Sequence, residues 1–361
     1  MHRRTLRRAV VFGAVALAVA TFTGVSTAGA APTSQVVSKA LGTTATAQSD
    51  AAYWTPARMK AAKPYPMPAV SKKSVTTQPA AATGTPTAIT GYSSTGQISS
   101  GRVPTGPVTP SLSPQAFSYP PPFTRFAVYP ASLMNSYPWK VNGKVFFVQN
   151  GGNFVCSGTA VVAPSGLRVW TAGHCTSDGA GHWDTKASFV PSYNNGSAPF
   201  GVWNVTNVYT SSSWFSGGDF SRDLGAMKVH VNAAGQKLSA VTGTAGFAYN
   251  QSYDQEWTDI SYPAAPPFNG LIPWEIHAAT ANTVNVGAGP AAIGIGSDFT
   301  GGSSGGSWRI LAGGSGVGYI NGHNDFKFIN PPQPLEMYSP YFDSLANAVR
   351  CTGEVTGSLG C

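Results

Sequence analysis

Residues 300–308 of this chain read Thr-Gly-Gly-Ser-Ser-Gly-Gly-Ser-Trp. Four glycines surround two adjacent serines, and glycine allows both a tight backbone turn and a close approach to main-chain N–H groups. A serine in such a loop can project its hydroxyl into a cleft while neighbouring N–H groups point at the same spot. Acyl transfer needs this arrangement, a nucleophile beside donors that hold a developing oxyanion. The alternative is a flexible Gly/Ser loop of the kind common in secreted proteins.

A histidine in a constrained setting lies upstream. Residues 169–175 read Val-Trp-Thr-Ala-Gly-His-Cys, so an apolar strand and a turn of small residues lead to His174, beside a cysteine that can anchor the loop. A general base must be held within hydrogen-bonding reach of its nucleophile, and tethering serves that need. His174 is the only one of the six histidines with this framing. For any single histidine, a purely structural hydrogen-bonding role is the alternative.

An acid stands immediately before another apolar strand, at residues 221–229, Ser-Arg-Asp-Leu-Gly-Ala-Met-Lys-Val. Asp223 can reach inward from the strand start, where a buried carboxylate facing a histidine fixes the imidazole tautomer and stabilises its charged form. The alternatives are an exposed turn aspartate or an ion pair with Arg222. Asp219 is the rival acid, but Gly217-Gly218 places it in a looser loop.

Short alternating apolar runs fill the chain from Tyr129 onward. Gly, Pro, Asn or Ser residues separate them, which is the pattern of strands and turns. Short strands without helical periodicity between them favour an antiparallel sandwich or barrel. Only Ser339–Arg350 has a helical pattern, with Leu345, Ala346 and Val349 on one face. The expected strands are Lys144–Gln149, Phe154–Val162, Arg168–Thr171, Ala187–Val190, Gly201–Val208, Leu224–Val231, Trp257–Tyr262, Thr283–Val286, Ile293–Gly296, Ser307–Leu311 and Val317–Asn321.

The formal charge of +8 on 361 residues would suggest a polyanionic partner, but its distribution argues otherwise. Residues 1–126 hold twelve Lys/Arg and one acid, a net of +11, whereas residues 127–361 hold ten Lys/Arg and thirteen Asp/Glu, a net of −3. The basic excess therefore lies in the N-terminal third, and a nucleic-acid partner is not expected.

The first thirty residues have the pattern of a secretory signal peptide. Four arginines precede the apolar run Val10–Ala20, and Ala28-Gly29-Ala30 follows it. A transmembrane anchor, the alternative, needs about 20 apolar residues, and Thr21–Thr27 interrupts this run. We expect cleavage near Ala30 and a secreted, extracellular product that no longer contacts a membrane.

The four cysteines, Cys156, Cys175, Cys351 and Cys361, all lie after residue 150. An even count in an oxidising compartment favours disulfides over a metal site, and neither CxxC nor HxxxH spacing occurs. Three connectivities remain open. Cys156–Cys175 with Cys351–Cys361 is favoured because these pairs close short loops.

Residues 31–126 form a region rich in Ala, Thr, Ser and Pro, with little aliphatic content. Such a composition buries too little apolar surface to offset chain entropy, so we expect it to be largely disordered. A small island with aromatic residues, Tyr53–Met59, interrupts it. Ahead of a globular part this region is interpreted as a pro-region removed after Arg102 or Arg125, with a permanent flexible spacer as the alternative.

The three stretches place histidine, aspartate and serine in that order along the chain, and unrelated folds order these groups differently. With TAGHC at Thr171–Cys175, RDLGAMKV at residues 222–229 and TGGSSGGSW, the sequence resembles the trypsin/chymotrypsin-like serine peptidases. It looks closest to the secreted bacterial branch that includes the glutamyl endopeptidases. The resemblance implies an all-β fold over residues 127–361, with two antiparallel six-stranded β-barrels, an active site between them and a C-terminal helix.

The resemblance also implies roles for individual residues. Ser304 would be the nucleophile, His174 the general base and then acid, and Asp223 the orienting carboxylate. The N–H groups of Gly302 and Ser304 would form the oxyanion hole. Ser303 is disfavoured as nucleophile because Gly-Gly should directly follow the reactive serine. The family's first short disulfide matches Cys156–Cys175.

Ser303 stands where the family usually has an aspartate. In the trypsin branch that carboxylate pairs with the new N-terminus formed on activation, and a neutral serine cannot make this ion pair. We therefore expect residues 31–126 to act as a folding aid or an inhibitor rather than to supply an activating N-terminus.

The substrate pocket is assigned by position to Asp298, Asn321 and His323. Asp298 lies six residues before Ser304, where trypsins carry the carboxylate that holds Arg or Lys, so the resemblance implies a lean towards basic side chains. Glutamyl endopeptidases use a histidine on the strand after the nucleophile. Here His323 lies two or three residues beyond that position, so a preference for Glu is not supported.

The functional expectation is a secreted serine endopeptidase that acts as a monomer on protein or peptide substrates. The alternative is a catalytically degenerate module of the same fold that binds cell-wall or other extracellular ligands through aromatic residues such as Trp203, Tyr209 and Trp214. A lipase would need G-x-S-x-G with the histidine last in the chain, which does not hold here. No cofactor or metal is implied, because this chemistry uses side chains and backbone dipoles.

Overall fold

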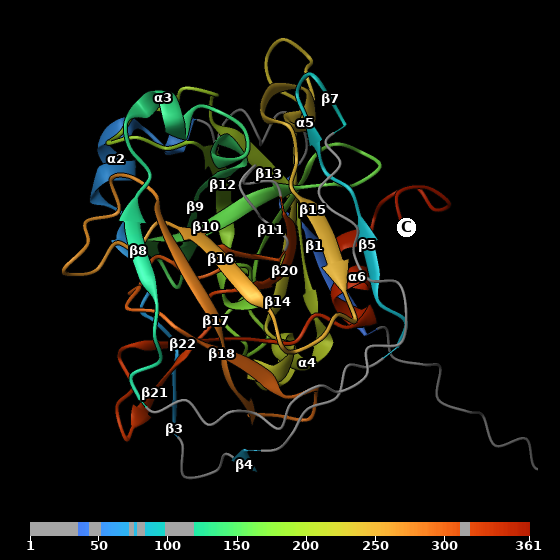
Figure 1. Cartoon of the computed structure of the whole chain (residues 1–361). Helices are drawn as coiled ribbons and strands as arrows, with labels where there is room; N and C mark the ends of the chain where they lie inside the picture. Colours follow the sequence, from blue (N-terminus) through green and yellow to red (C-terminus); the bar gives the residue numbers. More distant parts are fainter. Residues whose placement is uncertain (1–34, 43–51, 72–75, 78–83, 98–118, 311–317) are drawn as a thin grey trace, which may run out of the picture. The chain divides into compact units, whose positions relative to one another are not determined.

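The computed structural model describes residues 35–42, 52–71, 76–77, 84–97, 119–310 and 318–361 (Figure 1). The expected leader and its cleavage site near Ala30 lie outside these residues, as does Arg102. In the described part of the chain, no helix is both long and apolar enough to cross a lipid bilayer.

Six antiparallel strands close into a barrel in the first half of the globular part. The barrel closes because the start of Trp203–Ser211 pairs with one neighbour and the rest of that strand pairs with another. Val145, Phe147, Trp170, Phe189 and Met227 are among the fully buried side chains that fill the interior. In pairing order the strands are β12 (Thr185–Pro191), β9 (Asn142–Gln149), β10 (Gly152–Val161), β11 (Arg168–Ala172), β14 (Leu224–Val229) and β13 (Trp203–Ser211).

A second sheet is built mainly from the C-terminal half, and its core contains Trp257 and Trp308 with ring centroids 5.6 Å apart. Among the described residues, strand pairing does not close this sheet, and β15 pairs with β20 in parallel. The prediction of an all-β, chymotrypsin-like fold is confirmed, with one closed barrel and one open sheet. The main path runs β22 (Glu336–Ser339), β18 (Ala292–Gly296), β17 (Trp274–Asn285), β16 (Glu256–Ser261), β19 (Ser307–Ile310), β20 (Tyr319–His323), β15 (Gly246–Tyr249) and β5 (Thr87–Ile89).

The C-terminal helix α6 spans Ser344–Cys351. It begins later than predicted because Ser339 belongs to β22 and Asp343 caps the helix, accepting a hydrogen bond from the Leu345 N–H at 2.9 Å. The predicted apolar face, Leu345, Ala346 and Val349, packs into the core of the first barrel. The shorter elements are α3 (Ala131–Met134), η2 (Trp139–Val141), η3 (Gly173–Cys175), α4 (Ser212–Gly217), η4 (Phe220–Arg222), α5 (Leu238–Thr242) and the hairpin of β6 (Tyr92–Ser93) and β7 (Gly96–Gln97).

The N-terminal region differs from expectation. Where they are described, residues 31–126 are not disordered but add a helix and several strands, most of which join the two sheets (Figure 1). Composition misses this because an open sheet edge accepts a strand through backbone hydrogen bonds, whatever its side chains. The added elements are α2 (Pro56–Ala61), β1 (Val36–Ala40) on β13, β2 (Lys63–Pro64) on β10, β3 (Ala69–Ser71) on β21 (Lys327–Asn330), β4 (Thr76–Thr77) and β8 (Thr124–Ala127) on β17, and β5 on β15.

One of the two expected processing sites lies inside this added structure. Arg125 belongs to β8, where it pairs with Ile276 of β17, and its side chain forms an ion pair with Asp298. A peptidase needs an extended, accessible backbone to cut, so a paired strand is a poor cleavage site. Of the two sites, the structure therefore disfavours Arg125.

Candidate active site

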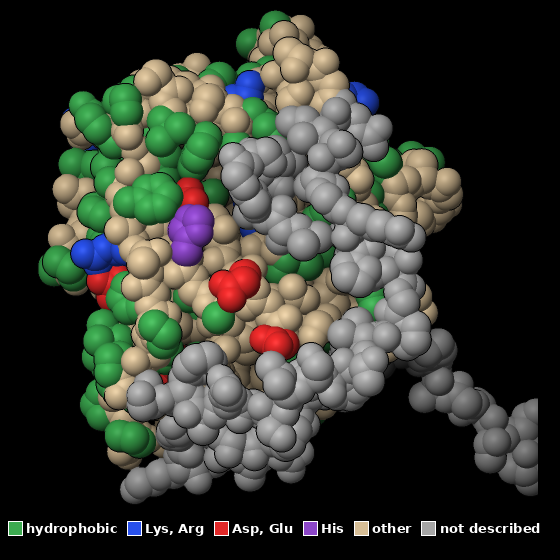
Figure 2. All heavy atoms as spheres, in the orientation of Figure 1, with side chains coloured by type: hydrophobic (Ala, Val, Ile, Leu, Met, Phe, Trp, Pro, Cys, Tyr) green, Lys and Arg blue, Asp and Glu red, His purple; other side chains and the backbone are tan. Residues whose placement is uncertain are grey.

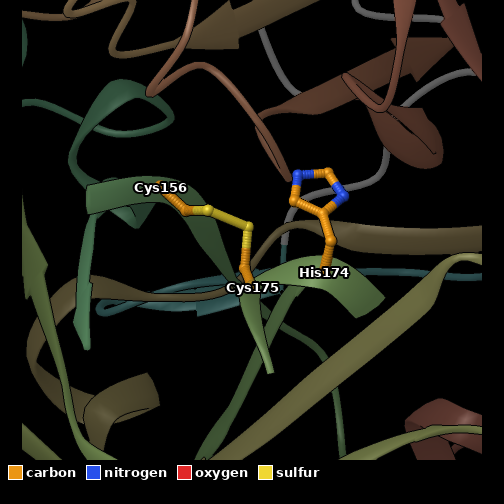
Figure 3. Close-up of side chains that lie close together, drawn as sticks. All are labelled: Cys156, His174 and Cys175. Carbon is orange, nitrogen blue, oxygen red and sulfur yellow. A yellow bond between two sulfur atoms is a disulfide. The ribbon is translucent and has the colours of Figure 1, made fainter. Parts of the chain in front are cut away.

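His174 lies in the η3 turn directly after β11, and this turn is covalently fixed. The disulfide Cys156–Cys175 joins β10 to the turn, while Cys351–Cys361 closes a separate loop at the C-terminus. These are the two pairings expected from loop length. Figure 3 shows the disulfide and the His174 imidazole on neighbouring residues, with the ring directed away from the sulfur atoms. The disulfide therefore anchors the turn and is not bonded to the His174 imidazole.

Asp223 holds His174 through both of its carboxylate oxygens. Oδ2 is 2.7 Å from Nδ1 of the imidazole, and Oδ1 accepts the His174 backbone N–H at 2.7 Å. A Cβ on Gly173 would lie 2.5 Å from Oδ1, so glycine at this position lets the carboxylate approach. Both side chains are essentially inaccessible to solvent. The arrangement fixes the ring so that Nε2 is its free nitrogen.

The charge state of Asp223 follows from these contacts. Burial alone would raise the pKa of the carboxyl, but the charge of His174 and the hydrogen bonds to it outweigh burial and hold the pKa below its ordinary value. Asp223 is therefore an anion near neutral pH. The carboxylate can therefore stabilise the positive charge that an imidazole general base acquires when it takes up a proton.

A second carboxyl group, Asp325, lies beside this pair and was not identified from the sequence. Its Oδ1 is 3.4 Å from Nδ1 of His174. Burial, followed by the nearby Asp223 charge, raises the pKa of Asp325 well above its ordinary value, which favours the protonated, neutral form of this acid. The only sequence signal was an acid shortly after an apolar strand, whereas Asp223 was recognised as an acid immediately before one.

The Ser304 loop is pressed against the barrel that carries His174. The Ser304 carbonyl accepts the Ser157 N–H of β10 at 2.7 Å, and the Gly305 N–H donates to the Asn324 carbonyl at 2.8 Å. Gly305 has a φ of +76°, and a Cβ there would lie 2.7 Å from the Ala172 nitrogen. Only glycine fits at this position. The contacted residue, Ala172, lies two residues before His174 in the chain.

Several buried polar atoms at this junction have no hydrogen-bond partner among the described residues. They include Nε2 of His174, Oγ of Ser304 and both carboxyl oxygens of Asp325. Buried polar atoms are normally paired, so unpaired ones mark a site whose partner comes from elsewhere. The hydroxyl of the adjacent Ser303 is likewise unpaired and buried.

Gly302 presents its N–H to a carbonyl from the N-terminal region. With φ at +90°, it donates to the Tyr65 carbonyl at 3.1 Å. The ring of Tyr65 stacks on His174, with centroids 5.3 Å apart and planes inclined by 26°. The N–H group expected to bind an oxyanion is therefore already bound to a peptide carbonyl.

The three residues assigned to a substrate pocket have separate partners. Asp298 is paired with Arg125, and the Asn321 side chain donates to the Ala248 carbonyl at 2.9 Å. His323 accepts a hydrogen bond from Nε1 of Trp170 at 3.2 Å, and burial lowers its pKa to about 3, so it is neutral. Among the described residues, no hydrogen bond or ion pair joins these three side chains to one another.

The aromatic residues of the binding-module alternative lie inside the protein. Trp203, Tyr209 and Trp214 are 2%, 4% and 4% exposed, so they cannot form a ligand platform on the surface. On the face drawn in Figure 2, Lys and Arg side chains of the described residues are scattered rather than gathered in a stripe.

Within the part of the chain that the structure describes, two clusters have the composition of metal sites. The Cys156 and Cys175 sulfurs lie near the His174 ring, but they are bonded to each other and cannot act as thiolate ligands. In the other cluster, His174, Asp223 and Asp325 each offer an atom within 4.8 Å of the others. There Nδ1 is committed to the hydrogen bond with Asp223.

No protein-family model matches the chain, and no curated protein matches it. Protease Anisep from Arthrobacter nicotinovorans is 35% identical with a TM-score of 0.54, and the match covers 59% of this chain and 94% of that one. The thermostable serine protease AL20 from an extremophilic microorganism is 33% identical with a TM-score of 0.55, over 63% of this chain and 100% of that one. A Glu endopeptidase in complex with MPD is 16% identical, over 62% and 94%, with a TM-score of 0.48.

The first two proteases match this chain over nearly their whole length. The closed barrel and the His-Asp contact at its rim agree with that relationship. The chain therefore belongs to the trypsin/chymotrypsin-like family of serine proteases.

Proposed function

We propose that this chain is a secreted serine endopeptidase in which Ser304 is the nucleophile, His174 the general base and Asp223 the orienting carboxylate. The observation that carries the proposal is the double hydrogen bond from Asp223 to His174, at 2.7 Å each, which leaves Nε2 buried and unpaired beside the Ser304 loop. Secretion is supported by two disulfides, which persist in oxidising compartments.

The reaction proceeds in two steps, formation of an ester with Ser304 and its hydrolysis. Oγ of Ser304 attacks the substrate carbonyl carbon while Nε2 of His174 takes its proton, and the proton then passes to the leaving amine as the peptide bond breaks. Water attacks the resulting ester, again giving a proton to His174, which returns it to Ser304 as the acid leaves. Throughout, the Asp223 anion stabilises the imidazolium and keeps Nδ1 protonated.

The developing oxyanion would be held by the N–H groups of Gly302 and Ser304. Gly302 already donates to a peptide carbonyl, so its N–H is directed at a position that a carbonyl oxygen can occupy.

A preference for basic side chains through Asp298 stays a prediction, since that carboxylate is paired with Arg125. Peptides with Arg, Glu or Phe before the scissile bond test it.

Hydrolysis by two neighbouring serine variants tests the proposal. We expect Ser304→Ala to reduce kcat on a fluorogenic peptide by about six orders of magnitude, to background, as loss of the nucleophile does in serine peptidases. Ser303→Ala is the matched control, because it removes an equally buried hydroxyl one residue away, and it should keep most of the activity. Full activity of Ser304→Ala, or loss confined to Ser303→Ala, would contradict the assignment.

A further inference from the structure

The segment from Tyr53 to Ser71 is anchored to the first barrel at its start. Trp54 is 2% exposed, packs on Phe146 with ring centroids 5.4 Å apart, and donates through its indole N–H to the Lys186 carbonyl. Met59 of α2 is buried in the same apolar cluster. Truncating a buried Trp removes a large packing contribution to stability. This end of the segment is therefore part of the core.

From this anchor the chain crosses to the second sheet. β2 pairs with Phe154 and Val155 of β10, and the Tyr65 N–H donates to the Val155 carbonyl at 2.9 Å. Beyond Tyr65, the Pro68 carbonyl accepts the Lys327 N–H at 3.0 Å, and β3 continues along β21. The segment is thus held on both sides of Tyr65 in the chain, by β10 before it and by β21 after it.

Tyr65 lies at the crossing point and contacts the proposed catalytic groups directly. Its ring stacks on His174, its hydroxyl donates to Gln149 at 3.0 Å, and its carbonyl accepts the Gly302 N–H. A Cβ on Gly301 would lie 2.6 Å from that carbonyl oxygen, so the loop glycines fit the segment's backbone closely. Ser304 and His174 are 0% and 1% exposed, although a working peptidase must admit substrate to both.

The peptide bond that follows the bound carbonyl is Tyr65–Pro66. Its nitrogen is tertiary and carries the proline ring, which fixes φ and leaves no N–H. Cleavage there would require His174 to protonate a nitrogen crowded by ring carbons. The Tyr65–Pro66 peptide bond, which follows the carbonyl bound to Gly302, is therefore poorly suited to cleavage.

From these contacts we infer that residues 53–71 are a built-in inhibitor, which fills the active-site cleft with its own peptide carbonyl in the oxyanion hole and blocks substrate until it is displaced. The inference rests on the proposed function and specifies what the N-terminal region does to that site. Of the two roles expected for the N-terminal region, a folding aid and an inhibitor, the inference selects the inhibitor. Tyr65 blocks the active site by occupying it, and α2 anchors the segment to the first barrel.

The test measures how fast the active serine reacts in the intact chain. The full chain is incubated with a fluorescent fluorophosphonate, and labelling is followed on the band of intact length. Tyr65→Ala removes the stacked ring and the hydroxyl bond, so the open cleft becomes more populated and we expect labelling at least about 10-fold faster than in the unaltered chain. Met59→Ala weakens the anchor away from the catalytic groups and should accelerate labelling in the same direction.

Two controls complete the experiment. Tyr129→Ala replaces another tyrosine that precedes a proline, but its side chain is 67% exposed, so labelling should match the unaltered chain. The double variant Tyr65→Ala with Ser304→Ala should not label at all. Circular dichroism confirms that each variant is folded.

The outcomes separate the two proposals. If the unaltered chain labels as fast as folded Tyr65→Ala and Met59→Ala, the inhibitory role is overturned while Ser304 remains the nucleophile. If no form labels and none hydrolyses peptides, the serine-peptidase proposal fails, and the inhibitor proposal fails with it.

Discussion

At the scale of single residues, Asp325 is the group whose role the structure adds to the proposed triad. In its protonated form this acid can donate a hydrogen bond to the Asp223 anion and help to orient it. Such a bond to a charged group contributes about 1.5–3 kcal/mol, or roughly 10-fold to 100-fold in rate. We expect Asp325→Leu to lower kcat by that factor with KM unchanged. Asp325→Asn keeps a donor and should retain most activity; equal losses in both variants would contradict a positioning role.

The same residue predicts a change of stability with pH. Because burial raises the folded-state pKa of Asp325 above 3.8, its contribution to stability is present below the unfolded pKa and is lost as pH rises towards the folded pKa. Asn has no proton to lose. The free energy of unfolding of Asp325→Asn relative to the unaltered chain should therefore increase between about pH 4 and about pH 7. Urea denaturation at both pH values measures it, and a constant difference would contradict the protonated state.

At the scale of elements, the contact between the Ser304 loop and β11 decides whether the two halves of the site meet. Gly305 has a φ of +76°, and a Cβ there would lie 2.6 Å from the Ser157 carbonyl oxygen. We expect Gly305→Ala to destabilise the fold by about 1–3 kcal/mol and to reduce kcat, because the loop must move away from β11.

Gly217→Ala is the matched control for that variant. A Cβ on Gly217 meets no atom within 4 Å, so both the free energy of unfolding and kcat should stay near those of the unaltered chain. Denaturant titration and peptide hydrolysis, measured in parallel, give the two quantities. A Gly305→Ala chain with unchanged stability and activity would show that the loop does not depend on this contact.

At the scale of the whole molecule, the sequence predicted what depends on local motifs. Strand and turn patterns predicted the all-β fold, and the framing of His174 and Asp223 marked two side chains that are in contact. The sequence did not predict contacts between segments that are far apart in the chain. Examples are the contact of Asp325 with His174 and that of Tyr65 with Gly302. Composition failed for the described segments of residues 31–126 because most of the strands there bind sheet edges through their backbone.

The central claim is that Ser304, activated by His174, is the nucleophile, and the covalent adduct tests it most directly. The Tyr65→Ala chain is treated with a fluorophosphonate and digested, and the modified peptide is sequenced by mass spectrometry, with a His174→Ala version in parallel. We predict the phosphonyl group on Ser304 and none when His174 is replaced. An adduct on Ser303 or elsewhere, or undiminished labelling without His174, would contradict the account.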